Sequence, residues 1–190
     1  MELNKVITRS ILTTLEAIGA LVLFIIIGLC ALFPSTSMEI AYDMGMEASC
    51  IHFAERAYKG SSDVYFIAYA TEVAIEEDKT AKIISCGEKF IKDEKFETYC
   101  GLKGENYEQF IYGRVCVSKY EKGKKEEAVT LAYESLNGTF PQGNALVAVL
   151  FSALKANDGE TVETIKTKLS GLSVEGEDGE YLQQTLALIG

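Results

Sequence analysis

The sequence predicts an all-α protein in which one transmembrane helix precedes a domain of stacked helical hairpins. Three observations predict this class. Residues 11–33 form a continuous apolar segment with Glu16 as its one charged residue. Residues 38–190 contain a single proline, Pro141, and their apolar residues recur at intervals of three and four, which is the helical period. Gly, Asn and Asp interrupt that pattern at short turns, and short turns between helices produce antiparallel hairpins.

The segment 11–33 is long enough to cross a bilayer. As a helix its 23 residues extend about 35 Å, against a hydrocarbon core of about 30 Å. Lys5 and Arg9 precede the segment and the next basic residue is Arg56, so the positive-inside rule predicts a cytoplasmic N-terminus. We therefore expect a single-pass protein of the cell membrane that contacts the lipid bilayer through Ile11–Phe33. Its expected parts are a cytoplasmic stub (1–10), a transmembrane signal anchor (11–33), a linker (34–37) and an extracytoplasmic domain (38–190).

Processing of the N-terminus is an open alternative. The small residues of Ser35-Thr-Ser37 suit a signal peptidase, and cleavage near Ser37 would release a secreted helical domain. An apolar core longer than the roughly 7–15 residues of a signal peptide favours a retained anchor instead, as does the bulky Phe33 near the site. Lipid attachment at Cys30 is disfavoured because Leu29 stands where a small residue is needed. A retained anchor, cleavage near Ser37 and lipid attachment at Cys30 would each export the domain.

Helical patterns begin directly after the linker. Three helices are expected first, over about 38–58, 63–77 and 79–92. Asp63 is a favourable N-cap for the second of them. Residues 93–105 are poorly patterned, and only a short turn around Phe96 and Tyr99 is expected there. The first helix should bury one apolar stripe, formed by Ile40, Met44, Ala48, Ile51 and Ala54.

Five further helices are expected in the second half of the domain. They cover about 106–121 and 124–137, the segment between the N-cap Asn144 and the turn at Asn157, about 160–171, and a short terminal helix over 181–189. The helix over 106–121 is expected to bury the stripe of Phe110, Gly113, Val117 and Tyr120.

The hairpin in the middle of this half carries a family resemblance. It resembles a tetratricopeptide repeat over about 34 residues, because its residues approximate that family's spacing of large, large, small, Gly, Ala, aromatic and Pro: Tyr112, Val115, Cys116, Gly123, Ala128, Ala132 and Pro141. The pattern departs at Lys119 and Ala132, where aromatic residues are usual, and Pro141 is one residue late. The resemblance implies hairpins stacked as a short tetratricopeptide-like solenoid, with Ala128 at a close helix–helix contact. An irregular helical bundle is the alternative.

Signatures of catalysis are missing from the sequence. The single histidine, His52, lies two residues from Cys50 and therefore on a different helix face. The five cysteines contain no CxxC pair, and the chain has no phosphate-binding loop, GxSxG or HExxH motif. We therefore expect no enzyme activity, cofactor or metal site. Cys86 and Cys100 could form a disulfide after export or remain buried thiols; the sequence leaves both open.

Binding to a protein or peptide is the function that remains. The net charge of -10 disfavours nucleic acid as a partner. The chain has ten tyrosines and no tryptophan, and tyrosines on a helical-repeat surface anchor partners unless they pack between helices. The candidates are Tyr65, Tyr69, Tyr107 and Tyr112. The leading hypothesis is a membrane-anchored scaffold or adaptor; the alternative is a structural subunit of a membrane complex.

Overall fold

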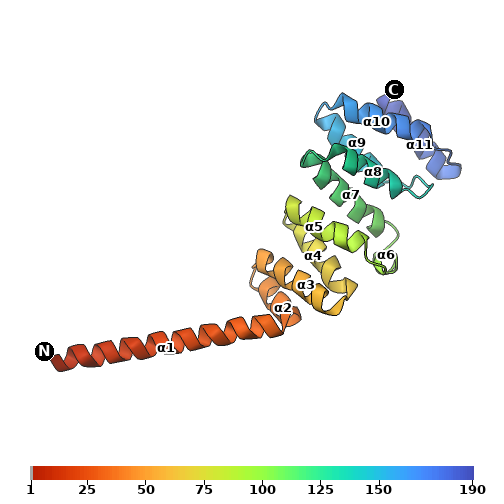
Figure 1. Cartoon of the computed structure of the whole chain (residues 1–190). Coiled ribbons are helices and arrows are strands. Elements are labelled where there is room, and N and C mark those ends of the chain that lie inside the picture. The colour runs from red at the N-terminus through yellow and green to blue at the C-terminus, as the bar shows by residue number, and fades with distance from the viewer. Residues whose placement is uncertain (1) are drawn as a thin grey trace.

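The computed structural model describes the backbone of residues 2–190 and the side chains of residues 11–190. Over that range the chain is helical and contains no strand (Figure 1). Lys5 and Arg9, on which the predicted orientation depends, have side chains outside the described residues. The helices are α1 (Glu2–Leu32), α2 (Pro34–Asp43), α3 (Glu47–Ser61), α4 (Val64–Glu76), α5 (Thr80–Ile91), α6 (Phe96–Lys103), α7 (Tyr107–Glu121), α8 (Lys125–Glu134), α9 (Ala145–Lys155), α10 (Gly159–Ser170) and α11 (Gly176–Ile189).

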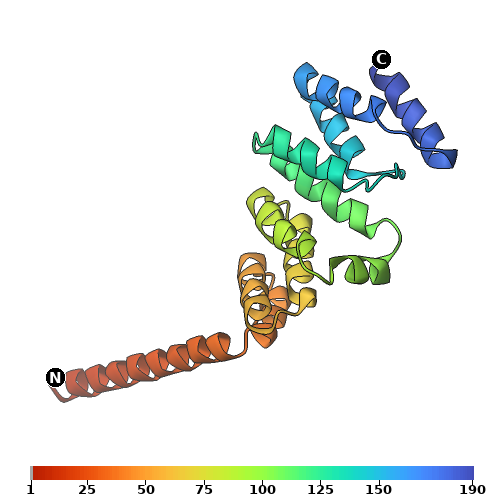
Figure 2. The same cartoon turned by 45° about the vertical axis from the view of Figure 1, so that its right-hand side comes forward.

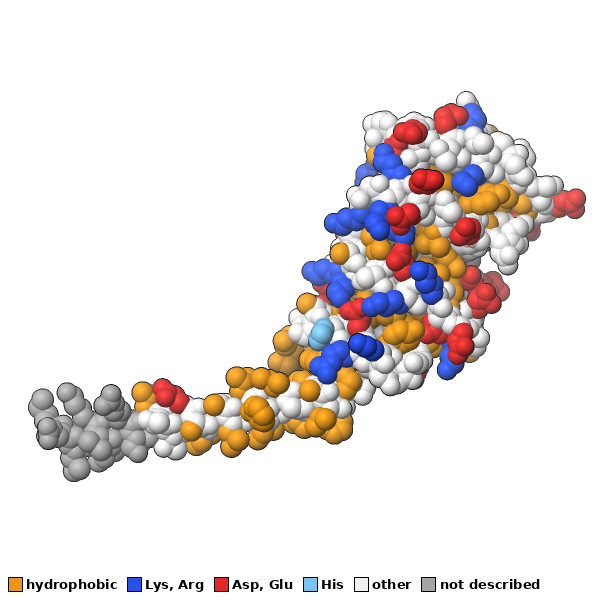
Figure 3. All heavy atoms as spheres, viewed as in Figure 1, with side chains coloured by type: hydrophobic (Ala, Val, Ile, Leu, Met, Phe, Trp, Pro, Cys, Tyr) orange, Lys and Arg blue, Asp and Glu red, His pale blue; other side chains and the backbone are white. Residues whose placement is uncertain are grey.

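Helix α1 projects away from all the other helices. Its stretch Ile11–Leu32 has a mean hydropathy of 2.6, and its most apolar window is not buried against any part of the protein. On the face seen in Figure 3, apolar side chains predominate along the described part of this helix, and an acidic side chain lies near its start. By length and composition it is able to cross a membrane.

Two boundaries near the base of the domain differ from the predicted ones. Residues 34–37, expected as a linker, form the first turn of α2, because Pro34 is accommodated at a helix N-terminus where its missing N–H is not needed. The helix expected over 38–58 is divided into α2 and α3, since Gly45 takes a positive φ of 64°. The apolar pattern continues across Gly45 without interruption, so helical periodicity alone could not predict the break between α2 and α3.

Within residues 34–170 the helices pair into four antiparallel hairpins, α2/α3, α4/α5, α7/α8 and α9/α10. Each hairpin is closed in the same way. One residue takes the left-handed conformation, and the N–H of the next residue donates back to a carbonyl five positions earlier, at 2.8 to 3.0 Å. This is the Schellman motif, which satisfies carbonyls that a helix end leaves unpaired. The left-handed residues are Gly45, Asp78, Gly123 and Asn157.

These four turns define a structural repeat. The left-handed residues are 33, 45 and 34 residues apart, and the longer middle interval contains the additional helix α6. The second helix of one hairpin packs against the first helix of the next, as in α3 on α4, α5 on α7 and α8 on α9. The hairpins are therefore stacked as a solenoid, which Figure 2 shows from a second direction. Tyr112 and Leu131 pack against both halves of its core.

Close helix contacts within the stack depend on small side chains. Gly87 of α5 faces Val115 of α7 so closely that an added Cβ would lie 2.2 Å from a Val115 methyl carbon. Ala128 of α8 is fully buried. The residue four positions before each left-handed turn is also buried and is alanine in three hairpins, Ala41, Ala74 and Ala153.

The fourth residue at this position is Lys119, which is buried with only 5% of its surface exposed. Its ammonium group forms ion pairs with Glu88 of α5 and with Glu127 of α8, the latter at 2.9 Å. Burial alone would lower the pKa of Lys119, but the hydrogen bonds to the two carboxylates raise it, so the side chain stays charged. Lys119 of α7 thus connects three helices, α5, α7 and α8.

The buried position of Ala128 can be tested by overpacking. Ala128→Leu should lower the free energy of unfolding by about 1–3 kcal/mol, because the added carbons have no space between α7 and α8. Chemical denaturation of a soluble form of the domain measures this change. The matched control is Glu126→Leu on the same helix, where the side chain is exposed and a change of about 0.5 kcal/mol or less is expected. Equal, small effects of both substitutions would contradict a close contact at Ala128.

Candidate interaction surface

The first helices of the hairpins present a common exposed side, which we call the first-helix face. A position on this face is described by the number of residues that separate it from the left-handed turn of its hairpin. Tyr65 and Phe110 each lie thirteen residues before the turn of their hairpin, at Asp78 and Gly123. Phe151 lies six residues before the turn at Asn157, which is the position that Glu72 occupies in the α4/α5 hairpin. Equivalent positions point the same way in a stacked repeat. Phe110 is 48% exposed and Phe151 is 57% exposed, so large apolar rings on this face are open to solvent.

An aromatic cluster lies on this face next to the first hairpin, α2/α3. The rings of Tyr65 and Tyr69 are stacked with their centroids 5.9 Å apart, and Tyr42 of α2 meets Tyr69 edge-on at 5.7 Å. Tyr42 and Tyr65 are 45% and 44% exposed, whereas Tyr69 is partly buried between them. Burial raises the pKa of Tyr69, so its hydroxyl stays protonated at neutral pH.

A second cluster connects α4, α6 and α7. The Tyr107 hydroxyl donates to the Glu72 carboxylate, and Lys103 forms an ion pair with the same carboxylate at 2.9 Å. The Lys103 ammonium group also lies over the rings of Tyr99 and Tyr107, 5.5 and 5.7 Å from their centroids. Burial and the bond to Glu72 raise the pKa of Tyr107. These contacts of Lys103 and Tyr99 hold the additional helix α6 beside the first-helix face.

The four tyrosines selected from the sequence therefore separate into three environments. Tyr65 and Tyr69 lie together, Tyr107 lies in the second cluster, and Tyr112 is partly buried in the core. The ring of Tyr112 meets Phe96 at 5.5 Å and 90°, and burial raises its pKa to about 12.

Sequence reasoning missed three other exposed rings, those of Tyr42, Phe110 and Phe151. Phe110 was expected in a buried stripe with Gly113, Val117 and Tyr120. Gly113 and Tyr120 are buried, whereas Phe110 is 48% exposed. The equivalence of Phe110 to Tyr65 follows from their equal distances to the turns at Gly123 and Asp78, but only once Asp78 is recognised as equivalent to the glycine.

Reactive groups are not gathered at any one place in the described part of the chain. The five thiols are free, and the disulfide between Cys86 and Cys100 that the sequence left open is not formed. Burial raises the pKa of Cys86 to about 11 and those of Cys100 and Cys116 to about 12, so these thiols are protonated. Among the described side chains, no group of three or more His, Cys, Asp or Glu is placed to hold a metal ion.

The first-helix face thus offers three exposed rings on consecutive hairpins, of which Tyr65 and Phe110 occupy the same position before their turns. This arrangement is suited to packing against another molecule. Comparison of the chain with protein families, curated proteins and solved structures finds no match.

The different environments of two tyrosines make a direct prediction about stability. Tyr112→Ala should lower the free energy of unfolding by about 2–3 kcal/mol, because it leaves a cavity beside Phe96. Tyr65→Ala should lower it by about 0.5–1 kcal/mol, since almost half of that side chain is already in water. Denaturant titration of the two variants separates packing from surface tyrosines. A loss at Tyr65 as large as that at Tyr112 would remove Tyr65 from the candidate surface.

Proposed function

We propose that this protein is a membrane-anchored interaction module that binds a protein or peptide on its first-helix face. The observation that carries the proposal is the exposure of a large ring on the first helix of each of three consecutive hairpins. Tyr65, Phe110 and Phe151 lie on α4, α7 and α9, and each is between 44% and 57% exposed. Large rings that are exposed but held in place lose little conformational freedom on binding, which makes aromatic residues frequent anchors of interfaces.

The stacked architecture supports the same function. In solenoid proteins each hairpin contacts only its neighbours, so an extended face is left for partners. The interval of 34 residues between Gly123 and Asn157 equals the length of a tetratricopeptide repeat, and we assign the α7/α8 and α9/α10 hairpins as degenerate repeats of that type. The acidic surface favours a protein over a nucleic acid as the bound partner.

A retained anchor fits the contacts at the base of the domain better than cleavage near Ser37. Ser37 is buried in the first turn of α2, and its hydroxyl donates to the Phe33 carbonyl at 2.9 Å. Arg56 of α3 donates to the Ala31 carbonyl at 3.3 Å, at the end of α1 where a helix carries partial negative charge. Removal of residues 1–37 would eliminate both contacts. We therefore propose a single-pass protein with a cytoplasmic N-terminus and an extracytoplasmic stack.

The proposed orientation is tested with a cysteine introduced at an exposed site. Ser173→Cys places a thiol on the connection between α10 and α11, whereas the four native cysteines of the domain are buried and should react slowly. A membrane-impermeant maleimide should label this variant in intact cells, and the wild type provides the background. Labelling that requires permeabilisation would contradict the orientation but leave the binding face untouched.

The binding face is tested by site-specific photo-crosslinking in membranes. A photoreactive phenylalanine analogue at position 65 or 110 should yield discrete crosslinks to one partner, because both positions lie on the proposed contact surface. Matched controls carry the same analogue at Thr130 of α8 or Thr164 of α10, which are exposed on the second helices.

A competing substitution makes the crosslinking test sharper. Tyr65→Ala should reduce the crosslinks formed from position 110 by about tenfold, since a ring that anchors an interface contributes about 1.4 kcal/mol or more. Crosslinks of equal yield from the second-helix controls, or no response to Tyr65→Ala, would refute binding at the first-helix face.

A further inference from the structure

The membrane-proximal end of the stack carries a packing surface without a protein partner. In each later hairpin the preceding hairpin covers one side of the first helix. The contact between Val115 and Gly87 lies on that side of α7, and its neighbours Ile111 and Ser118 are 0% and 4% exposed. The same positions in the first hairpin are Phe33 and Ile40, 55% and 54% exposed. Helix α2 has no preceding hairpin to cover them.

This end surface is apolar rather than polar. We define the base as Phe33, Ile40, Met44 and Met46, which are between 47% and 67% exposed. Phe33, Ile40 and Met44 follow one another at intervals of seven and four, so they form one stripe along α2. Ile40 and Met44 were expected in a buried stripe with Ala48, Ile51 and Ala54. Ile51 and Ala54 are buried, but the exposure of Ile40, Met44 and Ala48 corrects the predicted core. Terminal hairpins of a soluble solenoid normally carry a polar outer side, which makes an apolar base unusual.

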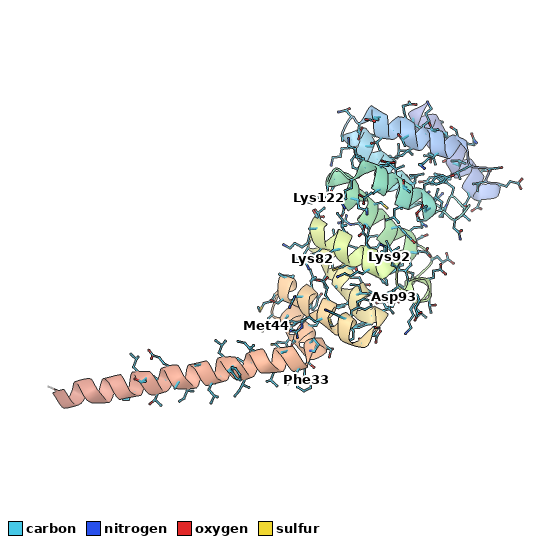
Figure 4. The ribbon with its side chains drawn as sticks, in the orientation of Figure 1. Phe33, Met44, Lys82, Lys92, Asp93 and Lys122 are labelled. Atoms are coloured by element: carbon cyan, nitrogen blue, oxygen red, sulfur yellow. The ribbon has the colours of Figure 1, made fainter. Side chains whose placement is uncertain are left out.

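We propose that the base rests in the interfacial region of the lipid bilayer, so that α2 is a membrane-surface helix. The base continues directly from the apolar surface of α1: Phe33 follows the candidate span without interruption, and Figure 4 shows Phe33 and Met44 at the junction of α1 with the stack. The proposal rests on the insertion of α1 in the membrane, which is part of the proposed function.

Charge around the base supports lipid as the occupant. Arg56 is exposed on the adjacent helix α3, and Figure 3 shows Lys and Arg side chains beside the apolar junction. Cationic groups that border an apolar stripe are characteristic of helices that lie at the headgroup boundary, where they contact lipid phosphates. On α2 itself, the exposed Glu39 and Asp43 lie on a different side from the stripe, as an amphipathic surface helix requires.

Membrane contact at the base would give the stack a fixed inclination. The Arg56 contact to the end of α1 and the resting base would be two restraints on the same hairpin, so α1 could not act as a flexible tether. The first-helix face would then be held at a defined distance from the membrane, where it would meet a membrane-bound partner more readily than a distant soluble one.

The absence of tryptophan from the chain allows a direct test. Met44→Trp introduces a single fluorophore at an exposed position of the base. The full chain is reconstituted in vesicles of phosphatidylcholine and phosphatidylglycerol whose acyl chains either carry bromine, which quenches indole on contact, or do not. Two matched variants are Phe24→Trp in the span and Leu188→Trp in α11, at positions 76% and 71% exposed.

We expect quenching by brominated lipid at positions 24 and 44 and none at position 188. Quenching at position 24 without quenching at position 44 would overturn the inference while leaving the anchor intact. No quenching at position 24 would refute the anchor, and with it the proposed function. Blue-shifted emission at position 44 that is not quenched, and that disappears when the protein is diluted in lipid, would show that a second copy of the chain covers the base instead.

Discussion

Closure of each hairpin by a residue in the left-handed conformation is the constraint on which the stack depends. The Schellman hydrogen bonds at Gly45, Asp78, Gly123 and Asn157 reverse the chain in a fixed geometry, so every pair of helices meets at the same relative position. Gly, Asn and Asp are the residues that adopt this conformation most readily. Because the turns are equivalent, the side chains before them are equivalent too. That equivalence produces both the buried stripe between hairpins and the exposed first-helix face.

The additional helix α6 is inserted at a junction of the stack where ion pairs reinforce the packing. Helix α6 lengthens the interval between Asp78 and Gly123, yet α5 still packs on α7 through the contact between Gly87 and Val115. Lys119 lies at the same junction and pairs with carboxylates from α5 and α8. Loss of one member of a buried ion pair is costly because it leaves the other charge unpaired. The lysine therefore favours this arrangement of three helices over alternatives in which it would be buried alone.

Much of the fold could be predicted from the sequence because helical periodicity is a local property. The caps at Asp63 and Asn144, the turns at Gly123 and Asn157, and the apolar helix α1 were all identified from neighbouring residues. The errors arose where the answer depended on distant parts of the chain. The stripe of Ile40 and Met44 has the pattern of a buried face, and only the lack of a preceding hairpin makes it exposed.

The candidate surface was predictable to a smaller extent for the same physical reason. Tyrosine is amphipathic, and its sequence neighbours do not decide whether it packs between helices or faces water. Tyr65 and Tyr112 look alike in sequence, yet the ring of Tyr112 meets Phe96 from the inserted helix, whereas one side of Tyr65 is open. The position of each tyrosine relative to its turn residue distinguishes Tyr65 from Tyr112. Finding that position requires alignment of the hairpins, whose turn residues are 33, 45 and 34 residues apart.

The two ends of the stack differ in the polarity of their exposed packing surfaces. A helical stack must expose one packing surface at each end, and in water that surface should be polar. The far end meets this requirement, because Glu180, Gln183 and Gln184 of α11 are exposed there, although Leu188 is exposed beside them. The near end instead exposes the Phe33, Ile40 and Met44 stripe where α1 joins the domain. An apolar surface at the end next to the candidate membrane span, opposite a largely polar one, is the asymmetry that the proposed arrangement, with water at one end and lipid at the other, would require.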